Sequence, residues 1–222
     1  MERHFDEELQ SLHKDILRMG ALAQEAIYKS VEALKNRDRT TAEEIIKGDS
    51  KIDHLEVDID EKCIDLIARH QPLASDLRFI TTGMKINTEL ERIADLAVDI
   101  SQRVLELSDK PLLKPLIDIP KLSAIAQDMV RDAIDSFIKK DAGLAREVVL
   151  SDSEADKLRN YVQNELVNDY MAKDASTADR AVPLLLVARH LERVCDHATN
   201  IAEDVVYMVE AKVIKHHPES LQ

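Results

Sequence analysis

Apolar residues recur along this chain with the period of an α-helix. Near the amino terminus they alternate three- and four-residue steps, at Leu9, Leu12, Ile16, Met19, Ala23 and Ala26. This spacing keeps an apolar stripe on one side of a helix, as in a helical bundle. The pattern continues through residues 40–69 and predicts a second helix that ends before Pro72, because proline restricts the residue before it and suits the first turn of the next helix. A long third helix is predicted over residues 73–107.

The middle of the chain contains its densest cluster of helix-breaking residues. Residues 110–120 include Pro111, Pro115 and Pro120, and we interpret this segment as a linker between two halves. Three further helices are predicted after it, over residues 122–140, 143–171 and 178–215. Pro183 lies inside the last of these and is expected to kink that helix or to delay its regular start.

The two halves are related in sequence. A shift of 103 positions places at least ten residues of the first half on identical residues of the second: Ala21, Ala23, Gln24, Asp38, Ala42, Glu44, Asp49, Ser50, Asp53 and Leu55. In the third helix of each half the shift becomes 101 positions, which places Glu91, Arg92 and Asp95 on Glu192, Arg193 and Asp196. Duplication of a three-helix unit predicts an all-α fold of two tandem three-helix bundles. The predicted domains are residues 1–109 and 121–222, joined by the linker 110–120.

Composition supports a helix-rich protein and narrows its partners. Four glycines in 222 residues, with 33% charged and 45% hydrophobic residues, are typical of such a protein. The net charge of −13 argues against nucleic-acid binding, which relies on attraction to phosphate, but suits divalent cations. Cys63 and Cys195 form no CxxC pair, and we expect two buried or half-buried thiols in a reducing cytoplasm.

The sequence gives no sign of a membrane-spanning or exported segment. The first eight residues lack the apolar stretch of a signal peptide, and the longest apolar run, residues 182–188, is far too short to span a bilayer. We therefore expect a cytoplasmic protein that reaches a membrane only through a partner.

A row of acids follows the third helix of each half. The first row is Glu91, Asp95 and Asp99, and the second is Glu192, Asp196 and Asn200. A spacing of four keeps each row on one side of its helix, with a drift of about 40° per step, and turns it away from the main apolar stripe. Such a row can be an ordinary solvated face, or it can be a set of hard oxygen ligands for Mg²⁺, Mn²⁺ or iron. Its recurrence in both halves favours the metal site.

Two histidines on the last helix leave two interpretations open. His190 and His197 are seven residues apart and could flank the second acidic row as ligands. The alternative is that both are ordinary histidines on a helix surface.

Two segments resemble the signatures of the PhoU family. They are residues 71–95, which include QPLASDLR and ELERIAD, and residues 188–204, ARHLERVCDHATNIAED. The resemblance covers nearly the whole chain. It implies a pair of three-helix bundles, often a homodimer, in which the two acidic motifs hold metal ions (iron, zinc, manganese or magnesium). The ligands that it implies are Glu91, Asp95, Glu192, Asp196 and Asn200, and Asp99 stands where the second motif has Asn200.

The resemblance also implies a function. Members of this family are negative regulators of the phosphate-starvation response. They link the ATPase subunit of a phosphate ABC transporter to a phosphate-sensing histidine kinase, and no enzymatic activity is expected.

This sequence departs from the family pattern at three positions. Ala94 and Cys195 stand where the family often has glycine, and Asp99 replaces an amide by a carboxylate, which should change the charge and metal preference of the first site. Arg92 and Arg193 are expected either to pair with neighbouring acids on the helix surface or to orient the motif carboxylates.

Other function classes can be weighed from the residues alone. A carboxylate-bridged di-metal enzyme uses Glu-x-x-His pairs that point into a bundle, and no glutamate here has histidine three residues later. Direct phosphate capture is disfavoured, because the chain has no P-loop glycine motif and is acidic. A metal-free helical adaptor remains an open alternative, since a regulator can act through surface contacts alone.

Overall fold

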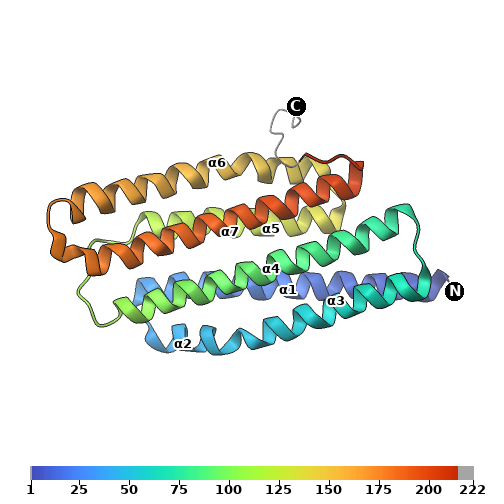
Figure 1. Cartoon of the computed structure of the whole chain (residues 1–222), viewed down its shortest axis with the longest axis horizontal. Helices are drawn as coiled ribbons and strands as arrows, with labels where there is room; N and C mark the ends of the chain where they lie inside the picture. The colour runs from blue at the N-terminus through green and yellow to red at the C-terminus, as the bar shows by residue number, and fades with distance from the viewer. Residues whose placement is uncertain (1, 215–222) are drawn as a thin grey trace.

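The computed structural model describes residues 2–214, which form long helices and include no strand. The first half contains four helices: α1 (Glu2–Asn36), α2 (Arg39–Gly48), α3 (Ser50–His70) and α4 (Ala74–Leu107). The second half contains α5 (Asp118–Lys139), α6 (Ala142–Asn164), a π-helical segment (Glu165–Met171), a short 3₁₀ turn (Ala175–Thr177) and α7 (Ala178–Glu210). The predicted all-α fold is therefore confirmed (Figure 1).

The two halves turn their first corner in the same way. Arg37 and Lys140, which are 103 positions apart, both adopt left-handed backbone conformations, with φ of 58° and 52°. Each is followed by an aspartate that caps the next helix. Asp38 accepts a hydrogen bond from the Thr41 N–H at 3.1 Å, and Asp141 accepts one from the Gly143 N–H at 2.9 Å. Such caps satisfy N–H groups that have no partner inside the helix.

The predicted helix over residues 40–69 is wrong in one respect, because it is divided into α2 and α3. The division lies at Gly48 and Asp49, where the Ile52 N–H donates to the Asp49 carbonyl at 2.7 Å, three residues back instead of four. Glycine inside a helix costs about 1 kcal/mol relative to alanine, so Gly48 has the lowest intrinsic helix propensity in the predicted helix 40–69. Ser151 occupies the equivalent position in α6, and α6 is continuous there.

The predicted limits of the second half need three corrections. Helix α5 begins at Asp118, inside the predicted linker, with Pro120 in its first turn where no N–H donor is needed. The predicted helix 143–171 changes to π-helical geometry from Glu165 onward. Helix α7 ends at Glu210, followed by Ala211 at φ 56°, and Lys215 of the predicted span lies outside the described residues.

Pro183 does not delay the start of α7, which begins five residues earlier at Ala178. Because Pro183 has no N–H, the carbonyl of Asp179, four residues back, receives no helical hydrogen bond from it. The Lys110 ammonium donates to that carbonyl instead, at 2.9 Å. The proline therefore helps to attach the linker to α7.

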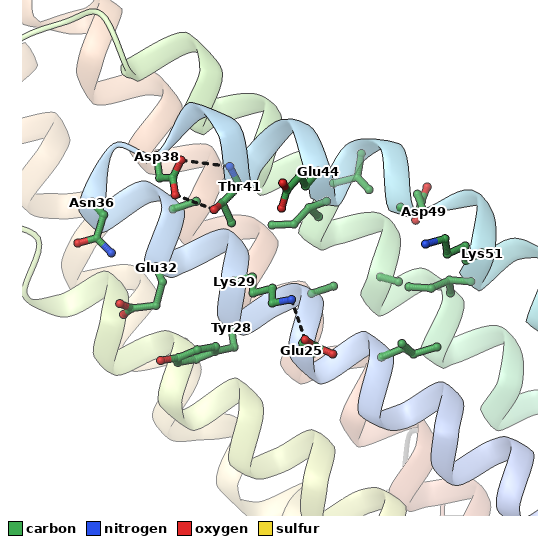
Figure 2. A pocket seen from close by; sticks show the side chains of 18 of the residues that line it. Glu25, Tyr28, Lys29, Glu32, Asn36, Asp38, Thr41, Glu44, Asp49 and Lys51 are labelled. Atoms are coloured by element: carbon green, nitrogen blue, oxygen red, sulfur yellow. Dashed lines mark hydrogen bonds and ion pairs between the residues drawn. The ribbon is translucent and has the colours of Figure 1, made fainter.

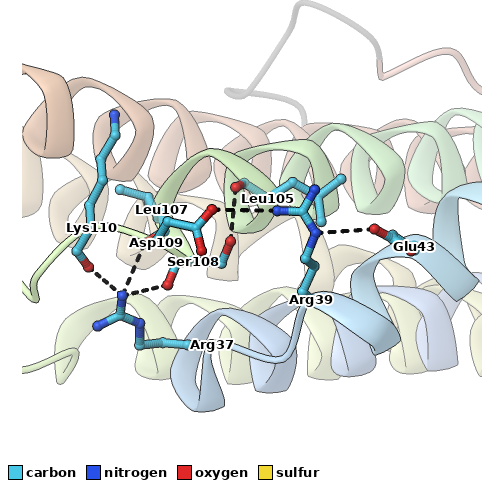
Figure 3. A network of polar contacts seen from close by, with 8 residues as sticks. All are labelled: Arg37, Arg39, Glu43, Leu105, Leu107, Ser108, Asp109 and Lys110. Atoms are coloured by element: carbon cyan, nitrogen blue, oxygen red, sulfur yellow. Dashed lines mark hydrogen bonds and ion pairs between the residues drawn. The ribbon is translucent and has the colours of Figure 1, made fainter.

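The C-terminal end of α4 is held by Arg37. Its Nη2 donates to the carbonyls of Ser108 at 2.5 Å, Leu107 at 3.4 Å and Lys110 (Figure 3). These carbonyls belong to the last turn of the helix and the residues after it, where a cation is favourable. The contact joins the end of α1 to the end of α4 and to the first residue of the predicted linker.

The two halves pack along α4 and α7, which run antiparallel. Lys85 approaches Asp204 at 3.1 Å, while Asp99 lies 3.6 Å from His190 further along the same pair of helices. Helices α1 and α5 also touch, and the buried apolar residues of both halves form one continuous cluster. In Figure 1, α6 follows one edge of the molecule, and α2 and α3 follow the opposite edge.

Other sequence predictions have mixed outcomes. Cys63 and Cys195 are buried free thiols, as expected. Within residues 2–214, no helix combines the length and apolar character needed to cross a bilayer. The domain limits 1–109 and 121–222 stay a prediction, and Met1 and residues 215–222 lie outside the described part of the chain.

Candidate metal centres

The first candidate centre lies between α3 and α4. Glu91 and Asp95 of α4 meet acids from the start of α3, and burial together with repulsion from Asp95 raises the pKa of Glu91 to about 7. The Oε2 atom of Glu91 is buried and has no hydrogen-bond partner. A buried carboxylate oxygen of this kind favours either a proton or a cation.

Three acids of the α2–α3 segment complete this first group: Asp49, Asp53 and Glu56. Burial, followed by repulsion from Asp53 and Asp95, raises the pKa of Asp49 to about 6. Burial and the neighbouring Asp60 also raise the pKa of Glu56. Each of these carboxylates is therefore held close to others of the same charge.

The second candidate centre lies between α6 and α7. Asp152 and Asp156 of α6 face Glu192 and Asp196 of α7, and partial burial with repulsion from Glu192 and Asp152 raises the pKa of Asp196 to about 6. The pKa of Asp152 is raised by burial and by repulsion from Asp156 and Glu192. The second group thus repeats the arrangement of the first.

Sequence reasoning missed the residues from the outer helices. Asp49 and Asp53, and their counterparts Asp152 and Asp156, were recognised only as identical positions of the duplication. Their four-residue spacing, repeated in both halves, was the available signal. The missing information was which face of α4 or α7 each pair meets.

Two predicted ligands lie in a different place. Asp99 is 3.6 Å from His190, and Asn200 donates to the Oε2 atom of Glu89 at 3.2 Å, so both lie at the seam between α4 and α7. Nδ1 of His197 is 2.6 Å from the same glutamate oxygen. The two histidines are partly buried in this seam, and burial lowers the pKa of His190.

The arginines of the two motifs differ in their contacts. Arg92 approaches Glu91 Oε2 at 3.5 Å and Asp95 Oδ2 at 3.4 Å. Its role in orienting these carboxylates stays a prediction. The partner of Glu192 is instead Arg159 of α6, at 2.8 Å. Arg193 lines an open hollow of about 540 Å³ beside the second group, together with Arg159 and Arg189.

A larger hollow of about 590 Å³ lies beside the first group. Helices α1, α2 and α4 and the start of α3 line it, and Figure 2 shows Asp38, Thr41 and Glu44 along one side of it. Its charges are mixed and partly paired, as between Lys29 and Glu25 at 2.7 Å. Because Asp49 is part of the wall, solvent and small cations can reach the first group from this side.

The residues fit a hard cation in chemistry, although they do not form a finished coordination shell. Within residues 2–214, no three histidine, cysteine, aspartate or glutamate side chains converge in the arrangement of a metal site. The donors are nevertheless carboxylates, which Mg²⁺, Mn²⁺ and iron prefer, and one of them has a buried oxygen that accepts no hydrogen bond. A bound cation would supply the positive charge that each group lacks, and it would draw the carboxylates closer together.

The sequence matches the PhoU domain twice, over residues 16–104 and 119–205. It is 43% identical over 209 residues to the phosphate-specific transport system accessory protein PhoU homolog of Aquifex aeolicus, covering 94% of each chain. It is 36% identical over 211 residues to the homolog of Clostridium acetobutylicum, covering 95% of this chain and 96% of that protein.

Solved structures show the same relationship. The crystal structure of PhoU from Pseudomonas aeruginosa superposes with a TM-score of 0.89 at 34% identity, covering 94% of this chain and 100% of that one. The phosphate transport system regulatory protein PhoU from Streptococcus pneumoniae superposes with a TM-score of 0.88 at 28% identity, covering 95% and 99%. With two domain matches, near-complete relatives and the same arrangement of helices, this chain belongs to the PhoU family.

Proposed function

We propose that this protein is a regulator of phosphate transport that represses the phosphate-starvation response when phosphate is abundant. The observation that carries the proposal is its near-complete match, in sequence and fold, to accessory proteins of the phosphate-specific transport system. This is an argument from family membership, since the fold alone does not determine a function.

The proposed partners follow from the same membership. The protein would contact the ATPase subunit of a phosphate ABC transporter and a phosphate-sensing histidine kinase in the cytoplasm, as a homodimer and without enzymatic activity. It would reach the membrane only through these partners. Its net charge of −13 supports a protein partner over a nucleic acid.

Metal binding is the second part of the proposal. Glu91 and Asp95, with Asp49 and Asp53, would hold a cation between α3 and α4, and the equivalent acids would hold one between α6 and α7. Iron, zinc, manganese and magnesium are the candidates. The buried Oε2 atom of Glu91, which accepts no hydrogen bond, and the repulsion from the neighbouring acids support this assignment.

A metal-free adaptor is the second candidate function. It is favoured by one specific observation: the carboxylates in the described residues do not converge on one point. In that case the acidic groups would act as charged surfaces for a partner, and regulation would continue without any cation.

The experiment that tests the regulatory role is deletion of the gene in its own organism. Expression of a phosphate-starvation reporter, such as secreted alkaline phosphatase, is measured in phosphate-rich medium. Derepression that the intact gene reverses is the expected result. Unchanged repression in a strain that lacks every PhoU paralogue would overturn the proposal.

Complementation with site variants separates the two candidates. A gene that encodes Glu91→Gln, Asp95→Asn, Glu192→Gln and Asp196→Asn is returned to the deletion strain, and protein levels are matched by immunoblot. Failure to repress, together with loss of bound metal in the purified protein, supports metal-dependent regulation. Full repression by this variant supports the metal-free adaptor.

A further inference from the structure

The two acidic groups differ at one position that the duplication makes directly comparable. Glu56 of α3 and Arg159 of α6 are 103 positions apart and occupy equivalent places in the two halves. Replacing an acid by an arginine changes the formal charge of that position by two. Each group therefore has the same four acids, two from the motif helix and two from the outer helix. The residue beside these acids is negative in the first group and positive in the second.

In the second group, the arginine already pairs with a motif carboxylate. Arg159 Nη2 donates to Glu192 Oε1 at 2.8 Å, and both side chains are largely buried, with 26% and 16% of their surface exposed. Its Nη1 donates to Asn160 at 2.8 Å and to Gln163 at 3.2 Å. These contacts hold the guanidinium in place. A charge-assisted hydrogen bond of this kind stabilises the carboxylate that accepts it.

In the first group, no cation occupies the equivalent place. Glu91, the counterpart of Glu192, has a buried Oε2 atom without a hydrogen-bond partner, and its nearest cation is the largely exposed Arg92 at 3.5 Å. Asp60 adds a further acid beside Glu56, and the Asn87 side-chain amide donates a hydrogen bond to Asp60 at 3.0 Å. The equivalent residues in the second half, Gln163 and Ala188, carry no charge.

The surroundings increase this difference. The hollow beside the second group is lined by Arg159, Arg189 and Arg193 as well as by the motif acids Glu192 and Asp196, so three basic residues face two acids in its wall. The net positive charge of this wall weakens the attraction of an incoming cation. The wall of the hollow beside the first group contains five acids, Asp49 among them, and three basic residues, so its net charge is negative. The charge of the two hollows therefore favours cation binding at the first group.

Building on the metal binding proposed above, we propose that the two centres are unequal: Arg159 serves as a built-in cation of the second centre, so that the first centre binds divalent cations more tightly. Arg159 takes one carboxylate out of cation binding and ties α6 to α7 without metal. The first centre, between α3 and α4, has no arginine that donates a hydrogen bond to its motif glutamate, so Glu91 and its neighbouring acids stay available to a bound cation.

The test uses the full-length protein, freed of metal by a chelator and dialysed against a series of free Mn²⁺ concentrations. Bound manganese is counted by elemental analysis. Glu91→Gln with Asp95→Asn should abolish the tighter binding step, whereas Glu192→Gln with Asp196→Asn should leave it in place. Arg159→Glu should tighten the second step at least tenfold, and Glu56→Arg should weaken the first by a similar factor.

Three controls keep the result interpretable. Arg131→Glu makes the same charge change on the exposed surface of α5 and should leave both steps unchanged. Arg159→Gln removes the cation without adding an acid. It replaces Arg159→Glu in the test if circular dichroism shows that Arg159→Glu does not fold. An intermediate tightening of the second step is expected for it.

Each outcome decides between the two proposals. Equal loss of manganese from both motif variants, or a second step that neither Arg159 variant changes, would overturn the inequality while metal binding itself stands. A wild-type protein that binds no Mn²⁺, iron or zinc would overturn the metal-binding part of the proposed function and the inequality with it.

Discussion

Lys110 donates from its side-chain ammonium to the backbone carbonyl of Asp179, at 2.9 Å. That carbonyl is the one that Pro183, which has no N–H, leaves without a donor in α7. The linker is therefore joined to the last helix through a backbone carbonyl that is free to accept because Pro183 cannot donate to it. This contact links the two halves through a backbone acceptor, in addition to their shared apolar core.

The first prediction concerns this contact. Lys110→Met should lower the free energy of unfolding by about 0.5–1.5 kcal/mol, the usual contribution of one hydrogen bond. In a Pro183→Ala background the alanine N–H can satisfy the Asp179 carbonyl, so the same change should cost less. Urea denaturation of the two single variants and the double variant measures the difference as a coupling energy. Additive changes in the free energy of unfolding would contradict the assignment of this hydrogen bond. Lys157→Met, on the exposed face of α6, is the control.

The second prediction concerns Arg37, whose guanidinium contacts three carbonyls at the end of α4. Arg37→Ala should destabilise the protein by about 1–3 kcal/mol, because charged donors to helix-end carbonyls contribute more than neutral ones. Lys140→Ala is the matched control, since Lys140 has the same left-handed backbone at the equivalent corner. Thermal unfolding by circular dichroism compares the two. Equal losses would mean that the backbone conformation, and not the guanidinium, sets the cost.

The third prediction concerns pH. His13 packs against Phe79 with ring centroids 4.5 Å apart, its Nε2 atom is buried without a partner, and burial lowers its pKa below the ordinary value of 6.5. At pH values between the lowered pKa of His13 and its ordinary pKa, the histidine binds more protons in the unfolded chain than in the folded one. The neutral ring's contribution to stability is therefore present above about pH 6.5 and is lost as the pH falls.

His13→Phe should remove this part of the pH dependence. Urea midpoints at pH 7.5 and pH 5.0 should differ less for the variant than for the wild type, with the variant favoured more at pH 5.0. His54→Gln changes an exposed histidine of α3 and should keep the wild-type difference. An unchanged pH dependence in His13→Phe would show that His13 takes no part in it.

The fourth prediction concerns Glu91 in the absence of metal. In chelator at pH 8, Glu91→Gln should raise the melting temperature by about 2–4 °C for each kcal/mol gained, because it removes a buried charge whose Oε2 atom accepts no hydrogen bond. Addition of Mn²⁺ should then stabilise the wild type more than the variant. Differential scanning calorimetry with and without Mn²⁺ measures both effects. Glu154→Gln, an exposed acid of α6, should show neither effect.

The helices could be predicted from the sequence because their apolar residues face a shared core and keep the 3.6-residue period. The interruption at Gly48 could not, since it depends on a local hydrogen-bond exchange that the apolar pattern does not record. The helix-capping aspartates Asp38 and Asp141 were visible only as identical positions in the two halves.

The acidic rows were predicted less completely than the helices, for a geometric reason. Residues spaced by four drift about 40° around a helix at each step, so two steps turn a row by about 80°. Glu91 and Glu192 point toward the outer helices, whereas Asp99 and Asn200 have turned to the seam between α4 and α7. A row of evenly spaced acids in the sequence is therefore divided in the structure, with some members facing the outer helix and others facing the seam between α4 and α7. Only the packing of the helices shows which acids meet.

The antiparallel pairing of α4 and α7 has a mechanical consequence. Each of these helices carries motif acids toward an outer edge of the molecule and polar contacts toward the other half. A rotation of α4 about its own axis that moves Glu91 toward α3 must also move Asp99 relative to His190. Because the two helices are in contact along their length, such a rotation is resisted or followed by α7. The acidic group at the outer edge and the contact between Asp99 and His190 therefore cannot move independently, because one helix carries both.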